Sequence, residues 1–232
     1  MAKLVIVRHG QSQANRDNIF TGWTDVPLTE EGIEQGRAVG KELASLGIQF
    51  DDAHTSYMAR AIKTLDIILD ETNQLYIPVH KTWRLNERHY GALSGLNKAK
   101  VKDEVGAEQL HKWRRGFTAL PPKLSERQHE RRYDRLGVKI PYSESLAMTQ
   151  ERLLPYWEDQ VAPRLLDGKN QLIVAHGSSL RALIKYLEQI PDNQIDKVEV
   201  PNGKPIMYDF DPALNIQKKT FITMDGEENG NS

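Results

Sequence analysis

The sequence predicts an α/β fold in which a mostly parallel sheet is flanked by helices and carries a basic insertion. One observation is a pair of short, continuous apolar runs rich in β-branched residues, at 4–7 and 172–175. Such runs are typical of strands buried on both faces, as in parallel sheets. The other is that apolar residues at helical spacing lie between and after them, and alternating strands and helices indicate βαβ units.

Helices are expected at 29–47, 55–69, 146–157 and 179–187. Thr29, followed by two glutamates, is typical of a helix start, because a capping hydroxyl and first-turn carboxylates stabilise a helix N-terminus. Thr55 or Ser56 is expected to cap the second helix. Pro155 is expected to bend the third, because proline removes a helical hydrogen bond.

The length and composition favour one large globular domain. The chain has 232 residues, 39% of them hydrophobic and none of them cysteine. We expect a single domain over 1–232, with 81–142 as a basic insertion or lid covering one edge of the sheet and 225–232 as a mobile tail. Disulfides, thiolate metal sites and a cysteine nucleophile are excluded. No signal peptide or membrane span is recognisable, so we expect a cytoplasmic protein with no membrane partner.

The charge is nearly balanced overall but unevenly distributed. The formal net charge is −1, with +8 between Lys81 and Lys139 and −9 in the remainder. A net charge near zero argues against nucleic acid as the partner. The local excess of positive charge instead indicates a small anionic partner.

Two segments deliver a histidine at the carboxyl end of a predicted strand, each followed by glycine. They are Arg8-His9-Gly10 and His176-Gly177. Ligands of open α/β sheets bind beyond the carboxyl ends of the strands, so both imidazoles are expected to converge there. One such histidine is more often structural, but two with the same local pattern beside Arg8 favour a functional site.

The surrounding sequence narrows the chemistry of these histidines. Neither has carboxylates at metal-ligand spacing nearby, so no metal site is expected. The serine-hydrolase pattern G-x-S-x-G fails around Ser178, and no nucleotide-binding glycine loop is present. A histidine acting as a nucleophile or acid/base on a phosphoryl group fits best, with Arg8 beside it.

A second constellation, 85–91, contains Glu87 and Arg88 without strand or helix periodicity. It is either a solvated loop with an ion pair or a proton-transfer carboxyl beside an anion-binding arginine. Arg114 and Arg115 follow a tryptophan within the basic segment. They are candidates for an anion clamp because a guanidinium binds phosphate or carboxylate through two hydrogen bonds.

Together these segments resemble the cofactor-dependent phosphoglycerate mutases of the histidine phosphatase superfamily. The motifs that carry the resemblance occur in family order at 4–12, 20–23, 60–61, 85–91, 113–117 and 175–177. The resemblance implies interconversion of 2-phosphoglycerate and 3-phosphoglycerate, primed by 2,3-bisphosphoglycerate and without a metal. The resemblance does not decide the oligomeric state, and a homo-oligomer is one possibility.

By position in the motifs, the resemblance implies that His9 carries the phosphoryl group as the nucleophile. Glu87 would exchange protons with the substrate hydroxyls, and His176 would stabilise the transferring phosphoryl. The small anionic phosphoglycerates would be bound by Arg8, Asn15, Thr21, Gly22, Arg60, Arg88, Tyr90, Lys98, Arg114, Arg115, Gly177 and Ser178.

The chain departs from the family pattern at a few positions. Gln11 stands where many members have Glu, Ala14 where many have Trp, and Ser178 where Asn is common. None of these changes removes a proposed catalytic group. Two alternatives are a phosphatase of the same superfamily that uses His9 but admits water, and a non-catalytic binder of phosphometabolites. The second is disfavoured because His9, Glu87 and His176 are all present.

Overall fold

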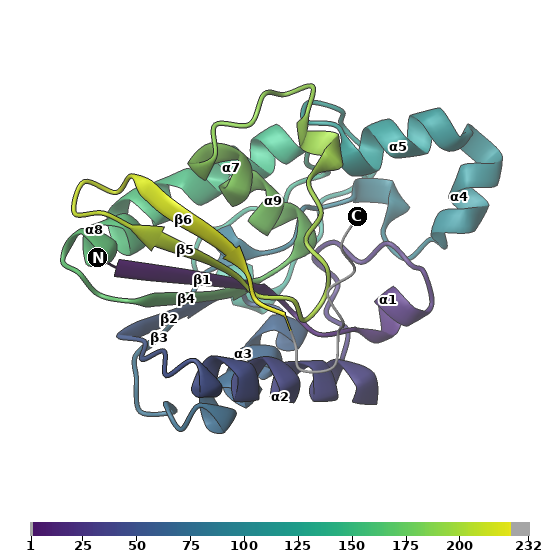
Figure 1. Ribbon diagram of the computed structural model, residues 1–232. Helices are drawn as coiled ribbons and strands as arrows, with labels where there is room; N and C mark the ends of the chain where they lie inside the picture. Colours follow the sequence, from purple (N-terminus) through teal and green to yellow (C-terminus); the bar gives the residue numbers. More distant parts are fainter. Residues whose placement is uncertain (1, 224–232) are drawn as a thin grey trace, which may run out of the picture.

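The computed structural model describes residues 2–223, which form a central sheet between two layers of helices (Figure 1). Within this part of the chain the strand order is β3-β2-β4-β1-β5-β6. The first four of these strands are mutually parallel, as predicted, whereas β5 and β6 add an antiparallel hairpin that the sequence did not indicate. The strands are β1 (Ala2–Arg8), β2 (Asp52–Thr55), β3 (Val79–Lys81), β4 (Gln171–Ala175), β5 (Ile206–Phe210) and β6 (Ile216–Phe221).

The helices alternate with the parallel strands. They are α1 (Gln13–Arg16), α2 (Glu30–Ser45), α3 (Ala59–Glu71), α4 (Lys98–Val105), α5 (Ala107–Arg115), α6 (Arg131–Asp134), α7 (Leu146–Tyr156), α8 (Ala162–Leu166) and α9 (Gly177–Leu187). Short 3-10 turns are η1 (Trp83–Leu85), η2 (Gly91–Leu93) and η4 (Ile195–Lys197), and η3 (Trp157–Val161) has π-helical spacing. Within residues 2–223 there is no helix of the length and apolar character that a bilayer crossing needs.

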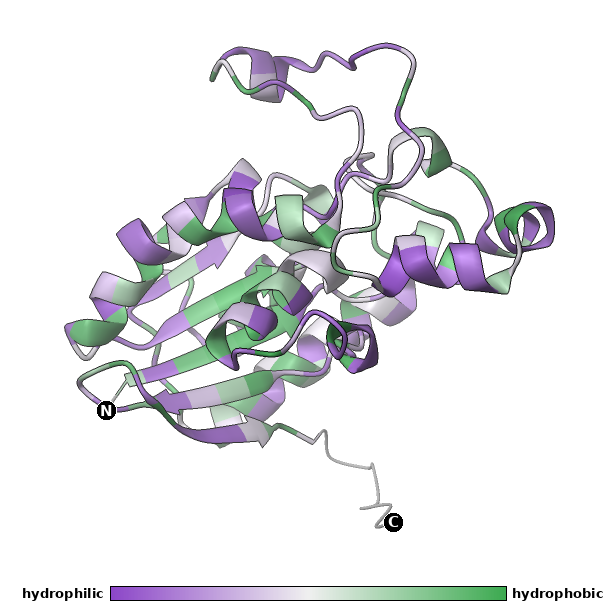
Figure 2. Cartoon of the chain, turned by 90° about the horizontal axis from the view of Figure 1, so that it is seen from above, coloured by the Kyte–Doolittle hydropathy of each residue, from purple (hydrophilic) through white to green (hydrophobic). Residues whose placement is uncertain are grey.

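The central strands are buried on both faces. Along β1, Val5 and Val7 pack with residues of α2 and α3, while Leu4 and Ile6 pack with residues of α7, α8 and α9. Successive side chains of a strand point to opposite faces, so one apolar run supplies both cores. Each of these fully buried side chains stabilises the fold by about 1.5–3 kcal/mol. Figure 2 shows the result: hydrophobic central strands beneath helices with hydrophilic outer surfaces.

The helix boundaries confirm one predicted cap and correct another. Thr29 is the N-cap of α2, and its hydroxyl accepts a hydrogen bond from the backbone N–H of Gly32. At α3 the predicted cap by Thr55 or Ser56 is wrong, because the N-cap is Met58 and carries no side-chain cap. Pro155 lies inside α7, and the helix widens to π spacing in the turn that follows.

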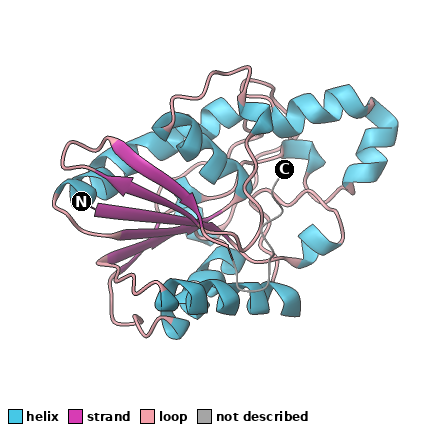
Figure 3. Ribbon diagram, in the orientation of Figure 1, coloured by secondary structure: helices cyan, strands magenta, loops and turns pink. Residues whose placement is uncertain are grey.

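The basic segment lies beyond the carboxyl ends of the parallel strands. Its helices α4 and α5 are joined to the strand ends by long loops (Figure 3). The expectation that this segment covers one edge of the sheet is wrong. Tyr133 of α6 instead packs with Trp23 and Met58 near the start of α3, where these apolar side chains bury one another. The mobile tail expected at 225–232 lies outside the described residues.

Candidate active site

The two histidines meet where β1 and β4 end. Arg8 pairs with Ala175 in the parallel register, and the backbone N–H of His9 donates to the carbonyl of Ala175 over 3.0 Å. The ring centroids of His9 and His176 are 5.0 Å apart, with an angle of 62° between the planes. Adjacent parallel strands therefore bring together two side chains that are far apart in the sequence, as the strand-end pattern predicted.

His9 is held in one orientation by the backbone. Its Nδ1 lies 2.7 Å from the carbonyl oxygen of Gly10, which can only accept, so Nδ1 carries the proton and Nε2 keeps its lone pair. Burial, with the charges of Arg60 and Arg8, holds the pKa of His9 well below its ordinary value. The imidazole is therefore neutral at physiological pH, with one nitrogen available as a nucleophile.

The glycine after His9 is required by close packing against α2. A Cβ at Gly10 would lie 2.1 Å from the carbonyl oxygen of Gly32 in the first turn of that helix. Any larger residue would push the strand end and α2 apart. The Arg-His-Gly motif thus sets the position of the histidine as well as its identity.

Glu87 approaches the histidines from the loop after η1. Its Oε1 accepts hydrogen bonds from the backbone N–H groups of Arg88, at 2.8 Å, and Ser178, at 3.0 Å. Ser178 lies in the first turn of α9, where unpaired N–H groups and the helix dipole favour an anionic group. On the other side, the indole N–H of Trp23 donates to the Glu87 carbonyl. The carboxyl is therefore fixed at the pocket wall.

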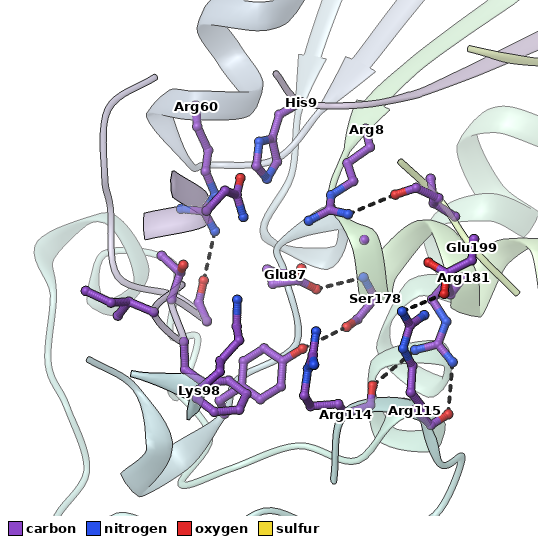
Figure 4. A pocket seen from close by; sticks show the side chains of 18 residues that line it. Arg8, His9, Arg60, Glu87, Lys98, Arg114, Arg115, Ser178, Arg181 and Glu199 are labelled. Carbon is purple, nitrogen blue, oxygen red and sulfur yellow. Dashed lines mark hydrogen bonds and ion pairs between the residues drawn. The ribbon is translucent and has the colours of Figure 1, made fainter. Parts of the chain in front are cut away.

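Cations surround these groups (Figure 4). Arg60 enters from α3, donating to the carbonyls of Gly22 and Thr24, and burial lowers its pKa to about 10. Burial also lowers the pKa of Arg8 and of Lys98. These side chains are held close together despite their mutual repulsion, which is typical of a site that binds a multiply charged anion.

The pocket brings together most of the site residues that the sequence analysis singled out. Those that line it are Arg8, His9, Asn15, Thr21, Gly22, Arg60, Glu87, Tyr90, Lys98, Arg114, Arg115, Gly177 and Ser178. Arg88 and His176 are fully buried behind this surface. Within residues 2–223 no three His, Asp or Glu side chains are grouped so that they could hold a metal ion.

Arg88 supports the wall rather than lining it. Its guanidinium donates to the carbonyl of Arg114 over 2.8 Å and lies 3.3 Å from the Tyr90 hydroxyl. It therefore anchors the carboxyl end of α5, the helix that presents Arg114 and Arg115.

Residues 4–217 match the family described as histidine phosphatase superfamily (branch 1). A 2,3-bisphosphoglycerate-dependent phosphoglycerate mutase 2 of Lactiplantibacillus plantarum is 53% identical over 225 residues, covering 94% of this chain and 98% of that protein. A 2,3-bisphosphoglycerate-dependent phosphoglycerate mutase of Streptococcus sanguinis is 48% identical over 228 residues, covering 96% of this chain and 99% of that protein. The chain belongs to this family of phosphoglycerate mutases.

Solved structures with the histidine phosphatase fold are similar to the structure of this chain. Bacillus stearothermophilus YhfR superposes with a TM-score of 0.73 at 20% identity, covering 98% of each chain. A mycobacterial glucosyl-3-phosphoglycerate phosphatase complexed with VO3 superposes with a TM-score of 0.73 at 23% identity, covering 98% of this chain and 100% of that one. At these identities the similarity concerns the fold.

In this phosphoglycerate mutase family member, five pocket residues lie outside the site set that the sequence analysis named: Ile19, Phe20, Arg181, Glu199 and Val200. Arg181 of α9 donates to the carbonyls of Arg114 and Arg115, at 3.2 and 2.9 Å, and to that of Ile195 at 2.7 Å. Glu199 forms an ion pair with Arg115, and the carbonyl of Val200 accepts from Arg8. These partners are backbone atoms or distant side chains, so no local sequence pattern marks them.

A buried ion pair supports the Glu87 loop from behind. Arg152 of α7 and Glu144 approach to 2.7 Å, and both side chains are less than a tenth exposed. Arg152 also donates to the carbonyls of Arg84, Asn86 and Glu87, at 2.6, 2.9 and 2.9 Å. The sequence marked this arginine only as part of a helix, because its loop partners lie more than 60 positions away.

Proposed function

We propose that this chain interconverts 2-phosphoglycerate and 3-phosphoglycerate in glycolysis and gluconeogenesis, through a phosphohistidine primed by 2,3-bisphosphoglycerate. The observation that carries the proposal is the state of His9. Its ring is neutral and its Nδ1–H donates to the carbonyl of Gly10, so Nε2 is free to act as the nucleophile beside Arg8 and Arg60. The names of the relatives from Lactiplantibacillus plantarum and Streptococcus sanguinis support this pair of substrates.

The charges in the pocket fit such substrates. Lys98 and the guanidinium groups of Arg8, Arg60, Arg114 and Arg115 line the pocket. Among residues 2–223, two carboxylates line it with them, those of Glu87 and Glu199. A phosphoglycerate brings one phosphate and one carboxylate, and the bisphosphate primer brings a second phosphate. We assign the anion-binding role to these cations together with Asn15, Thr21, Gly22, Tyr90, Gly177 and Ser178. Arg88, behind the pocket surface, would serve binding by holding Tyr90 and the end of α5 in place.

In the proposed reaction, His9 and Glu87 act in two linked steps. With a phosphoryl group on His9, Glu87 takes the proton of a phosphoglycerate hydroxyl as that oxygen bonds phosphorus and the phosphorus–Nε2 bond breaks. His9 then takes the other phosphoryl group of the resulting bisphosphate. In that step the ester oxygen keeps the bonding electrons and receives the proton back from Glu87. Both groups return to their starting states.

The remaining catalytic work is electrostatic. Phosphoryl transfer requires mainly alignment and stabilisation of charge on the equatorial oxygens. We assign this stabilisation to Arg60 and His176, which are fully buried, and to Arg8, which is partly exposed. Exclusion of water from His9, of which 3% is exposed, protects the phosphohistidine from hydrolysis.

The test compares two products from 3-phosphoglycerate in the presence of a trace of 2,3-bisphosphoglycerate. We expect 2-phosphoglycerate to form much faster than inorganic phosphate; the reverse ratio would identify a phosphatase. Bisphosphate labelled in the phosphoryl groups should give an acid-labile label on the protein. That label should vanish in His9→Ala and persist in the control His111→Ala, whose ring is exposed. A label that survives in His9→Ala would reject His9 as the nucleophile.

Several broader features belong to the same proposal. We infer that the chain forms a single domain over 1–232 in which residues 81–142 act as a lid. We also infer that the protein is cytoplasmic, binds neither nucleic acid nor membrane, and needs no metal. Prolonged treatment with a chelator should leave the mutase activity intact, and a loss restored by a divalent metal ion would contradict the metal-free mechanism. A homo-oligomer stays a prediction, for which light scattering is the direct measurement.

A further inference from the structure

Ser56 occupies a place in the site that no helix-capping role explains. It follows the last residue of β2 and is fully buried. Its Oγ lies 2.7 Å from Nε2 of His176, at the end of the neighbouring strand β4. The two strands are parallel neighbours with Thr55 opposite Val174, so the strand ends carry the hydroxyl and the ring to the same point.

The hydrogen atoms around Ser56 can be assigned from its second partner. The backbone N–H of Met58 donates to the same Oγ over 3.1 Å. An amide N–H can only donate, so the hydroxyl is left to direct its own proton elsewhere, and Nε2 of His176 is the acceptor within reach. In this arrangement Nε2 is unprotonated and the proton of the neutral ring lies on Nδ1.

The opposite tautomer leaves more groups unpaired. If Nε2 donated to Ser56, the hydroxyl proton would have no acceptor among the contacts of Ser56 in residues 2–223, and burying an unpaired donor costs free energy. Nδ1 would then present a lone pair. Nδ1 is buried and has no partner within the described part of the chain, and its ring is 5.0 Å from that of His9. A lone pair there would repel an anionic phosphoryl group on His9.

We propose that Ser56 is a positioning residue that sets the tautomer of His176, so that Nδ1–H is ready to donate to an oxygen of the phosphoryl group transferred to and from His9. The inference rests on the proposed phosphohistidine reaction for its purpose, but the tautomer itself is a property of the resting protein. Burial, with the charges of Arg60, His9 and Arg8, holds the pKa of His176 well below its ordinary value, which keeps the ring neutral so that a single proton must be placed.

The first measurement reads the tautomer directly in the unmodified protein. The chain has seven histidines, so ¹⁵N-histidine labelling gives a spectrum in which long-range ¹H–¹⁵N correlations separate the two tautomers. The signal of His176 is assigned by its loss in His176→Gln. We expect Nδ1 protonated and Nε2 unprotonated in His176. Protonation of Nε2 instead overturns the proposal and leaves the proposed mutase reaction untouched.

The second measurement links the tautomer to turnover. Ser56→Ala should lower kcat roughly 10–100-fold, because a fixed donor to the transition state is no longer enforced, while KM for 3-phosphoglycerate changes less than about twofold. Its His176 signal should shift towards the Nε2-protonated form. Ser56→Thr restores the hydroxyl and should recover both kcat and the wild-type signal. Thr72→Val, which removes a buried hydroxyl at the far end of α3, is the matched control and should keep both.

Other outcomes count against the role of Ser56. Wild-type kcat in Ser56→Ala, or a lost kcat with an unchanged His176 tautomer, would refute it. If Ser56→Ala does not fold, the wild-type spectrum and Ser56→Thr still decide the question. An absence of mutase activity in the wild-type protein would instead reject the proposed function, while the tautomer measurement would stand on its own.

Discussion

The Glu199 carboxylate lies 2.6 Å from the Arg115 guanidinium, on the wall of a pocket whose other charges are mostly positive. Arg115 is itself less than a quarter exposed, whereas Glu199 is largely exposed. Glu199 is therefore the counter-ion of Arg115 in the resting protein, and an anionic substrate group that binds Arg115 competes with it.

This competition predicts tighter substrate binding when the carboxylate is removed. Glu199→Gln should lower KM for 3-phosphoglycerate roughly two- to fivefold at low ionic strength, and the effect should shrink in salt because the site mouth is open to solvent. Steady-state kinetics at two salt concentrations measure it. Glu158→Gln makes the same charge change at an exposed position outside the pocket and should leave KM unchanged. A raised KM in Glu199→Gln would show that the ion pair instead holds Arg115 in its binding position.

Replacing Arg181 by lysine keeps the charge but changes the geometry of its hydrogen bonds, and we expect this change to weaken substrate binding. Its guanidinium holds three backbone carbonyls, including those of Arg114 and Arg115, and a lysine ammonium cannot span them. Arg181→Lys should therefore raise KM for 3-phosphoglycerate about tenfold, because the two clamp arginines lose their fixed position. Arg164→Lys, on α8 and remote from the pocket, is the control. Equal KM values in Arg181→Lys and wild type would mean that Arg88 alone anchors this wall.

A histidine outside the pocket predicts how stability depends on pH. His54 is fully buried, accepts from or donates to Tyr156 and Gln171 at 2.8 Å, and burial lowers its pKa to about 4. The unfolded chain, with a pKa near 6.5, binds the proton first as pH falls. Stability from this group is thus present above pH 6.5 and is lost between pH 6.5 and 4, by about 2 kcal/mol from pH 7.5 to pH 5.

Urea unfolding at pH 7.5 and pH 5 tests this sign and size. His54→Gln should be less stable than wild type at pH 7.5 but should lose less stability on acidification. His111→Gln, which replaces an exposed histidine, should follow the wild-type pH dependence. An identical pH dependence in His54→Gln and wild type would refute the assignment to His54, leaving the other buried histidines as the source.

The parts of the fold that the sequence predicted well are those encoded locally. The apolar runs of β1 and β4 and the Thr29 cap each lie within a few residues, and the structure confirms them. The hairpin of β5 and β6 was not predicted because Met207 breaks the apolar–polar alternation of β5 in the sequence and because β6 is largely polar. The insertion was misplaced because Tyr133 packs with aromatic partners that lie far away in the chain.

The candidate site divides in the same way. His9, Glu87 and the clamp arginines stand in short motifs that can be read directly. Arg181 and Arg152 act on backbone carbonyls of distant loops, and any residue type offers a carbonyl. Such contacts leave no trace in residue identity, so only the folded chain reveals which arginines support the site and which bind its ligand.

The buried pair of Arg152 and Glu144 gives the largest expected loss of stability. Arg152→Met would leave the Glu144 carboxylate buried without its cation and would strip donors from the carbonyls behind the Glu87 loop. We expect the free energy of unfolding to fall by about 3–5 kcal/mol. Adding Glu144→Gln to Arg152→Met should recover part of that loss, because the unpaired charge is then removed as well.

Breaking an exposed pair is the matched control for Arg152→Met. Arg37→Met separates Arg37 from Glu34 on the surface of α2 and should cost less than about 1 kcal/mol. Urea unfolding of the variants measures both effects, and kcat of Arg152→Met reports on the Glu87 loop. A small loss in Arg152→Met, comparable with that in Arg37→Met, would mean that the carbonyls of the loop and the Glu144 carboxylate find other donors. In that case the Glu87 loop would owe its position to Trp23 and to the first turn of α9.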